Sequence, residues 1–237
     1  MSSPPNGPDL YLLSSLVVRK ALDDAVLPAF EVASGLSVRT EYLPTTILLE
    51  KIDAGAQPDV LIGTREAMLD LEASGVLAGG SAMPLVTSAL GLGVAQGSDP
   101  PSMATGSDLV AALLGARSVA FSRAGQSGIF FQELLLRLGI ANQVLERATV
   151  LDSGFTGTAL RDGRSDLALQ QVSELLFVEG IGIVVPLPEE FQQHTDFFLA
   201  PGPGAAGKAA ARRLVDHLTD GPARSAYLAT GLQNIGA

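Results

Sequence analysis

Residues 36–64 read LSVRTEYLPTTILLEKIDAGAQPDVLIGT, and this stretch decides the fold class. Apolar residues alternate through Leu36–Tyr42 and gather again over residues 58–63, which is typical of two short strands. Between them, Pro44-Thr-Thr opens a helical pattern that Gly55 ends. A strand, a helix and a second strand at this spacing predict a parallel sheet with right-handed crossovers.

The same alternation continues on both sides of this stretch. Upstream, Leu10–Ser15 is expected to be a buried strand, followed by a helix that Pro28 should kink or shorten by its last turn. Downstream, a helix is expected over Arg65–Ser74. A second run of strands is expected at residues 118–122, 149–151, 166–170 and 181–185. Helices are expected at residues 125–138, around 159–160, and at 172–178, 208–218 and 223–230.

Two such runs predict an α/β fold with two lobes. Each lobe would be a mixed, mostly parallel sheet flanked by helices. We expect lobe 1 to comprise residues 8–88 and 196–237, and lobe 2 to comprise residues 89–195. Two extended segments, near residues 86–95 and 193–200, would join the lobes as a two-strand hinge.

Composition excludes several classes of protein. The chain of 237 residues carries a formal net charge of −10, which opposes binding to nucleic acid and to anionic membranes. It has no cysteine, so disulfides, thiol nucleophiles and cysteine-bound metals are excluded. No apolar stretch approaches the length of a membrane span. We expect no metal and no cofactor.

The first eight residues contain no basic segment and no apolar core, so they are not a signal peptide. The protein is therefore expected to be periplasmic or otherwise extracytoplasmic if a signal peptide has been removed, and cytoplasmic if not.

Four strand-to-helix turns carry small polar residues: Ser14-Ser15, Thr45-Thr46, Gln126-Ser127-Gly128 and Ser153 to Thr158. Ligands of α/β sheets bind beyond the carboxyl ends of the strands. Helix N-termini there offer free N–H groups that suit an oxyanion. The alternative is that each Ser or Thr only caps its own helix.

The sequence resembles the molybdate-binding proteins of ABC importers over nearly its whole length. The resemblance lies in Leu13-Ser-Ser-Leu16, Pro44-Thr-Thr, Asp53-Ala-Gly-Ala-Gln-Pro-Asp-Val-Leu-Ile62 and Ala168-Leu-Gln-Gln-Val-Ser173. It implies the type 2 periplasmic-binding-protein fold, in which two lobes close on a ligand. Relatives that handle tricarboxylates, including an aconitate-isomerase-like branch, are similar as well.

The resemblance also implies ligand positions. Ser15 matches the first-turn serine of that family, and Thr45 or Thr46 matches the second-turn serine. Ser127 and Ser153 fall at positions that donate a backbone N–H, and Gln171 stands where many relatives have a tyrosine. The neighbouring residues Ser14 and Gly128 are included in the predicted site.

Arg123 departs from the neutral donors of a molybdate site. It follows a predicted strand, and a guanidinium pairs well with a carboxylate, so in the site it would favour a small organic acid. As a solvated loop residue it would have no such role.

The leading hypothesis is a solute-binding protein that captures a small anion between its lobes for ABC-type import, with a transporter permease as partner. An isomerase of unsaturated tricarboxylates on the same fold is the alternative. It would need a general base, and the candidates are Asp152, Glu174 and His194. A cytoplasmic sensor domain is a third hypothesis, which no DNA-binding element supports.

Two further features of the sequence are expected to have no functional role. Gly202-Pro-Gly-Ala-Ala-Gly207 satisfies the dinucleotide pattern, but too little chain follows to complete a nucleotide-binding unit. We interpret it as a flexible loop. His217 lies on a predicted helix and is interpreted as a partly exposed surface residue rather than a catalytic base.

Overall fold

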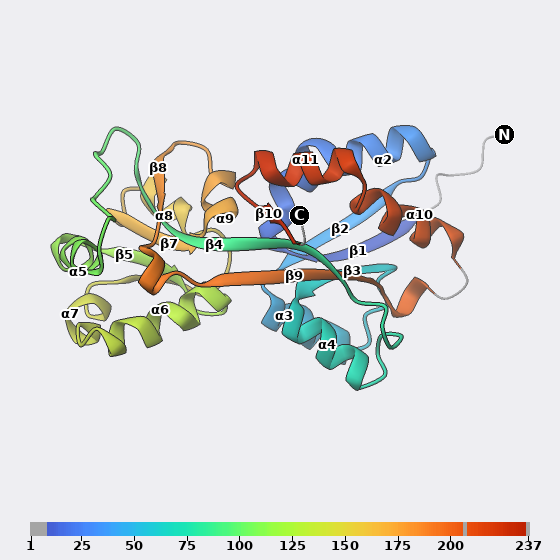
Figure 1. Ribbon diagram of the computed structural model, residues 1–237, viewed down its shortest axis with the longest axis horizontal. Coiled ribbons are helices and arrows are strands. Elements are labelled where there is room, and N and C mark those ends of the chain that lie inside the picture. The colour runs from blue at the N-terminus through green and yellow to red at the C-terminus, as the bar shows by residue number, and fades with distance from the viewer. Residues whose placement is uncertain (1–8, 206–207, 236–237) are drawn as a thin grey trace. The chain divides into compact units, whose positions relative to one another are not determined.

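The computed structural model describes residues 9–205 and 208–235, and these residues divide into two compact units (Figure 1). Unit 1 contains the chain up to Thr87 and again from Asp196 onward, and unit 2 contains Ser88–Thr195. Strands β4 (Met83–Ala95) and β9 (His194–Pro201) each supply residues to both units.

Unit 1 is built on a parallel core of three strands. Strand β1 (Leu10–Ser15) pairs in parallel with β2 (Val38–Leu43) and with β3 (Val60–Thr64). Strand β9 adds to β3 in the antiparallel direction, and the short β10 (Gln233–Asn234) pairs with Val86 and Thr87 of β4.

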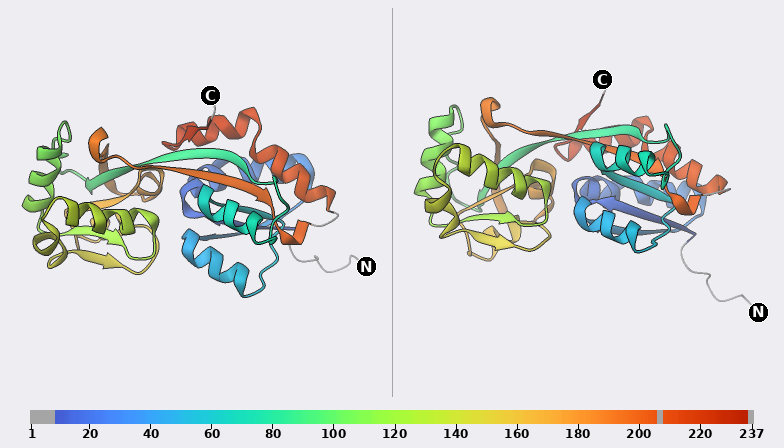
Figure 2. Two further views of the ribbon diagram at one scale, coloured as in Figure 1. Left: turned by 60° about the horizontal axis from the view of Figure 1, so that its bottom comes forward. Right: turned by 90° about the horizontal axis from the view of Figure 1, so that it is seen from below.

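Helices cover both faces of this sheet, as the views in Figures 1 and 2 show. The segment after β1, with α10 (Ala209–Leu218) and α11 (Gly221–Ala229), packs on one face around Leu12, Ile62 and Tyr227. Helices α3 (Thr45–Asp53) and α4 (Arg65–Ala73) pack on the other face. The alternation of inward and outward residues along β1 and β3 produces these two cores.

The helix after β1 is irregular just before Pro28, the residue where a kink or a separate last turn was expected. It continues past this proline, as a 3-10 turn at Leu16–Val18, α1 (Arg19–Ala21), a π-helical turn at Leu22–Val26 and α2 (Leu27–Ser34). The Leu27 N–H donates to the Leu22 carbonyl, five residues back. A proline has no N–H to donate. Just before Pro28, the backbone hydrogen bonds of the helix therefore span five residues instead of four, and the last turn remains helical.

Unit 2 has its own parallel centre. Strand β5 (Val119–Ser122) pairs in parallel with β6 (Thr149–Leu151) and with β7 (Leu167–Gln171). Strand β4 pairs in the antiparallel direction with β7 and with β8 (Ile181–Pro186). The prediction of an α/β fold with a mixed sheet and flanking helices is confirmed.

The helices of unit 2 also lie on two faces. One core contains residues of α5 (Gly106–Gly115), α6 (Gln126–Arg137) and α7 (Ala141–Leu145), and the other contains residues of α8 (Gly157–Arg161) and α9 (Val172–Phe177). Short 3-10 turns lie at Glu189–Phe191 and, in unit 1, at Pro203–Ala205.

Two of these helices are absent from the sequence-based prediction, α5 and α7. Helix α5 has a sequence signal that the prediction overlooked, a capping box. The Thr105 side chain accepts from the Asp108 N–H, and the Asp108 carboxylate accepts from the Thr105 N–H. Among the described residues, no helix combines the length and the apolar character needed to cross a membrane.

Candidate functional site

The carboxyl edge of the sheet in unit 1 brings two predicted residues together. Strands β1 and β2 are parallel, with Ser15 level with Leu43, so Thr45 follows β2 directly beside the end of β1. The Ser15 Oγ and Thr45 Oγ1 atoms lie 3.2 Å apart, and both side chains are buried. A pair of adjacent buried hydroxyls can donate to one bound oxyanion.

These hydroxyls do not cap their helices. Ser15 precedes the 3-10 turn without a side-chain capping bond, and its Oγ lies 3.3 Å from the Ile62 carbonyl. Helix α3 begins after Pro44, which has no capping group, so Thr45 is its first residue. The capping alternative therefore fails for Ser15 and Thr45.

The other hydroxyl residues at this edge, Ser14, Thr46 and Thr64, differ from this pair in their hydrogen bonds or exposure. The Ser14 Oγ donates to the Ser15 carbonyl at 3.0 Å, so this hydroxyl is engaged locally. Thr46 is partly exposed in the first turn of α3. Thr64, which sequence reasoning missed, ends β3 and caps α4 by accepting from the Ala67 N–H. Its place at a strand-to-helix turn was the available signal.

In unit 2, α6 starts against the end of β5. Ser127 is buried in the first turn of α6, after Gly125, which offers no side-chain cap. Gly128 is the next residue, and a Cβ there would lie 1.7 Å from the Ser122 carbonyl oxygen. Gly128 was predicted as a ligand residue, but its contact with Ser122 gives it a packing role.

Arg123 and Ser153 lie in exposed turns. The Arg123 N–H donates to the Leu151 carbonyl at 2.7 Å, which ties the turn after β5 to the end of β6. The Arg123 guanidinium is 3.8 Å from the Asp152 carboxylate, and the two side chains are 71% and 96% exposed. A pair this long and exposed contributes little stability, so Arg123 is available to another carboxylate.

Beside β5, the carboxyl end of β7 carries buried polar groups. The Gln171 Nε2 donates to the Thr195 Oγ1 at 3.3 Å, while its Oε1 is buried without a hydrogen-bond partner. The Oγ atoms of Ser122 and Ser173 are buried and unpartnered as well. Sequence reasoning missed Ser122 and Ser173, because only the fold shows which hydroxyls lie inside.

Glu174, in the first turn of α9, is partly exposed as a whole residue, but protein surrounds its carboxyl group. That burial raises the pKa of the Glu174 carboxyl to about 8. Hydrogen bonds from the Gln170 side chain and the Gln171 backbone lower the pKa, but their effect is smaller than that of burial. Gln170 is anchored in turn, because its Oε1 accepts from the Thr156 N–H at 2.7 Å. The Glu174 carboxyl is therefore protonated at neutral pH and available for proton transfer.

The other two base candidates lack such an environment. Asp152 is almost fully exposed, and His194 is an exposed residue at the start of β9. Among the described residues, no group of three or more His, Asp or Glu side chains is placed to hold a metal ion.

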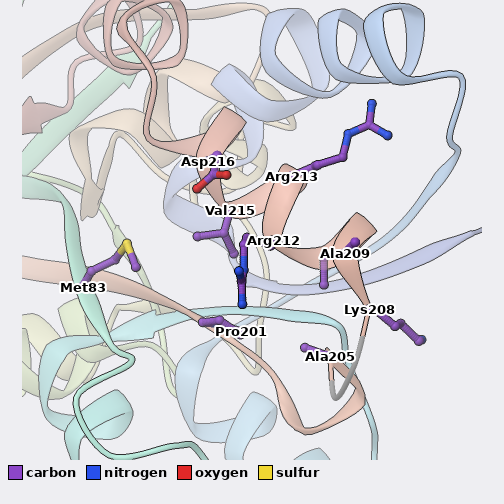
Figure 3. A pocket seen from close by; sticks show the side chains of 10 residues that line it. Met83, Pro201, Ala205, Lys208, Ala209, Arg212, Arg213, Val215 and Asp216 are labelled. Atoms are coloured by element: carbon purple, nitrogen blue, oxygen red, sulfur yellow. The ribbon is translucent and has the colours of Figure 1, made fainter.

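A groove of about 700 Å³ lies elsewhere in unit 1, lined by Met83, Pro201 and residues of α10 (Figure 3). Pro201 pairs with Val60, the first residue of β3, so the groove lies at the opposite edge of the sheet from Ser15. Lys208 at this groove forms an ion pair of 2.6 Å with the buried Asp59. The groove is therefore separate from the candidate site.

The glycines of the dinucleotide-like motif have a packing role. The N–H groups of Gly202 and Gly204 donate to the carbonyls of Asp59 and Pro58, at 2.9 and 2.8 Å. A Cβ at either glycine would lie 2.4 Å from a backbone oxygen of residues 57–58. These N–H groups cannot cradle a phosphate, and this part of the loop is held rather than flexible; residues 206–207 of the motif lie outside the described residues.

His217 is partly exposed, which agrees with the prediction. Its Nε2 lies 3.0 Å from the Val26 carbonyl, and its Nδ1 lies 3.2 Å from the Asp220 carboxylate. These contacts join α10 to the helical segment after β1, so the role of His217 is structural.

Two α/β units, each with polar turns at the carboxyl edge of a parallel sheet, define the class of two-lobed periplasmic-type binding proteins. Residues 10–233 match the family model of the bacterial extracellular solute-binding proteins. The chain belongs to this family.

This chain is similar to an isomerase and to two anion-binding proteins. An aconitate isomerase of Pseudomonas sp is 28% identical over 218 residues, which are 90% of this chain and 83% of that protein. The periplasmic molybdate-binding protein of Azotobacter vinelandii has the same fold, with a TM-score of 0.79 at 18% identity, covering 94% of this chain and 98% of that one. The sulfate-binding protein SubI of Mycobacterium tuberculosis H37Rv gives a TM-score of 0.73 at 16% identity, covering 96% and 87%.

Proposed function

We propose that this protein captures a small anion, either a tetrahedral oxyanion such as molybdate or a small organic di- or tricarboxylate, for ABC-type import. The observation that carries the proposal is the pair of buried hydroxyls of Ser15 and Thr45, which are 3.2 Å apart and do not serve as helix caps. Neutral donors of this kind can bind an anion although the chain as a whole carries a net charge of −10.

Each unit carries candidate ligand residues at the carboxyl edge of its own strands. These are Ser15, Thr45 and Thr46 in unit 1, and Arg123, Ser127, Ser153 and Gln171 in unit 2. Binding to both units would favour a closed form of the protein, in proportion to the difference in ligand contacts between open and closed forms.

Membership of an extracellular solute-binding family supports a place outside the cytoplasm and an ABC transporter permease as partner. The permease would receive the ligand from the closed form, and the chain itself would not enter the membrane.

Ligand-dependent melting tests the proposal. With one of molybdate, tungstate, sulfate, citrate or trans-aconitate at about one hundred times its dissociation constant, stability should rise by about 2.7 kcal/mol. For a chain of this size that is an increase in melting temperature of roughly 5–10 °C. The double variant Ser15→Ala, Thr45→Val should lose this increase, and Ser37→Ala, at the opposite end of the β1–β2 pair, should keep it. If no member of the set raises the melting temperature, anion capture is wrong.

An isomerase is the second candidate function, favoured by the carboxyl of Glu174 and by the similarity to an aconitate isomerase. A pKa of about 8 suits a group that takes a proton from one carbon of an allylic system and returns it to another.

Proton NMR in D₂O tests this activity directly. With cis- or trans-aconitate as substrate, the enzyme should interconvert the vinyl signals and incorporate deuterium. Glu174→Gln should lower the rate at least a hundredfold while retaining ligand-dependent melting. The absence of any interconversion by the unchanged protein would eliminate the isomerase.

A further inference from the structure

Among the described residues of unit 2, five side chains have a buried polar atom without a partner, those of Ser88, Ser122, Ser165, Gln171 and Ser173, and three of them lie at or just after the carboxyl ends of β5 and β7. Ser122, Gln171 and Ser173 are 2%, 3% and 1% exposed, and the Oγ, Oε1 and Oγ atoms of these residues have no partner. A buried polar atom without a partner destabilises a protein, so a group of them needs an explanation.

The three residues lie at one edge of one sheet. Strands β5 and β7 are parallel neighbours, with Ala120 level with Ala168, so Ser122 at the end of β5 is level with Gln170. Gln171 ends β7 and Ser173 follows it. A Cβ built on Gly125 would lie 3.6 Å from both the Ser122 Oγ and the Ser127 Oγ, which places these two hydroxyls around the same glycine.

Arg123 adds a cation at the same edge. It follows Ser122 directly, and its one ion pair among the described residues is the loose contact with Asp152. A ligand with a single compact charge would use either the neutral donors or this guanidinium. A ligand with two carboxylates on a short carbon chain can use both.

We propose that the Ser122 and Ser173 hydroxyls donate to one carboxylate of an organic di- or tricarboxylate, and that Arg123 pairs with a second carboxylate of the same molecule. This inference rests on the proposed function, because it specifies the ligand of that site. The two hydroxyls then lack a partner only while the ligand is absent, whereas the Gln171 Oε1 atom is an acceptor and does not bind an ionised carboxylate.

The test separates binding from stability in the full-length chain. Ser122→Ala and Ser173→Ala should each weaken binding of trans-aconitate or succinate, measured by titration calorimetry, by about tenfold to a hundredfold. The same variants without ligand should melt at the same temperature as the unchanged protein or higher, since each removes an unsatisfied hydroxyl. A hydroxyl with only a structural role would change stability and leave affinity unchanged.

Two serines of unit 2 serve as matched controls. Ser165 is 2% exposed with an unpartnered Oγ, but it precedes the amino end of β7; Ser165→Ala should leave affinity unchanged. Ser118 is buried, and its Oγ lies 2.8 Å from the Thr149 Oγ1. Ser118→Ala should lower the melting temperature and leave affinity unchanged.

Arg123→Gln tests the class of ligand. It should weaken binding of the carboxylates at least tenfold, with a stronger effect at low salt, and should change molybdate binding less. Unchanged carboxylate affinity in Ser122→Ala and Ser173→Ala, or binding of molybdate but of no carboxylate, would overturn the inference while leaving anion capture intact. Failure of every anion to bind the unchanged protein would instead overturn the proposed function.

Discussion

Replacing Gly128 with alanine is expected to destabilise unit 2 by about 3 kcal/mol or more. The new Cβ would lie 1.7 Å from the Ser122 carbonyl oxygen and 2.8 Å from its carbon. Both are backbone atoms, so no change of rotamer relieves the clash, and α6 must move away from β5. Since Ser127 lies in the same turn of α6, anion binding should be lost together with stability.

Scanning calorimetry and amide hydrogen exchange of α6 measure this effect. The melting transition of unit 2 should fall by roughly 10 °C. Gly115→Ala is the matched control, because Gly115 ends α5 with no atom within 4 Å of its built Cβ. That change should be neutral or slightly stabilising. A Gly128→Ala protein that melts with the unchanged protein would contradict the packing role of Gly128.

Replacing Glu174 with glutamine is expected to stabilise the protein at pH 8 and to flatten its stability profile. The pKa of Glu174 rises from an ordinary value of 4.5 to about 8 because the carboxyl is buried. Below pH 4.5 both the folded and the unfolded chain hold this proton. Between pH 4.5 and 8 only the folded chain holds it, so this group lowers the free energy of unfolding as pH rises through that window.

Glutamine removes the ionisation and keeps an acceptor for the Gln171 N–H. The rise from 4.5 to about 8 predicts a gain at pH 8 on the order of 4 kcal/mol, which should vanish near pH 4. Urea unfolding at several pH values measures it. Glu179→Gln, a change at an exposed carboxylate, is the control and should leave the profile unchanged. If the free energy of unfolding changed with pH in the same way in Glu174→Gln and in the unchanged protein, the Glu174 carboxyl would be solvated.

The same variant bears on function. In an isomerase, the protonated form of Glu174 can act as a general acid and the small ionised fraction at neutral pH as a general base. In a binding protein, the neutral carboxyl avoids adding a negative charge to unit 2. Loss of catalysis with retained binding in Glu174→Gln would indicate the first role, and retained transport competence would indicate the second.

The sequence by itself determined most of the order of strands and helices, all but α5 and α7, because this order depends on local signals. The apolar run at Leu10–Ser15 and the end of a helix at Gly55 are such signals, and the structure has a strand at Leu10–Ser15 and a helix that ends just before Gly55. It also placed Ser15 and Thr45 at the ends of neighbouring strands, because strands joined by crossover helices are parallel and end at the same edge.

Only the tertiary structure decided what each polar residue does there. Side-chain hydroxyls at strand ends became an unpartnered group at Ser122, a locally bonded group at Ser14 and a helix cap at Thr64. Two further features depend on packing that the pattern does not show, namely the burial that raises the pKa of Glu174 and the close approach of α6 to the end of β5 that requires glycine at position 128. Periodicity reports which face a residue occupies, whereas burial and hydrogen-bond partners depend on what packs against that face.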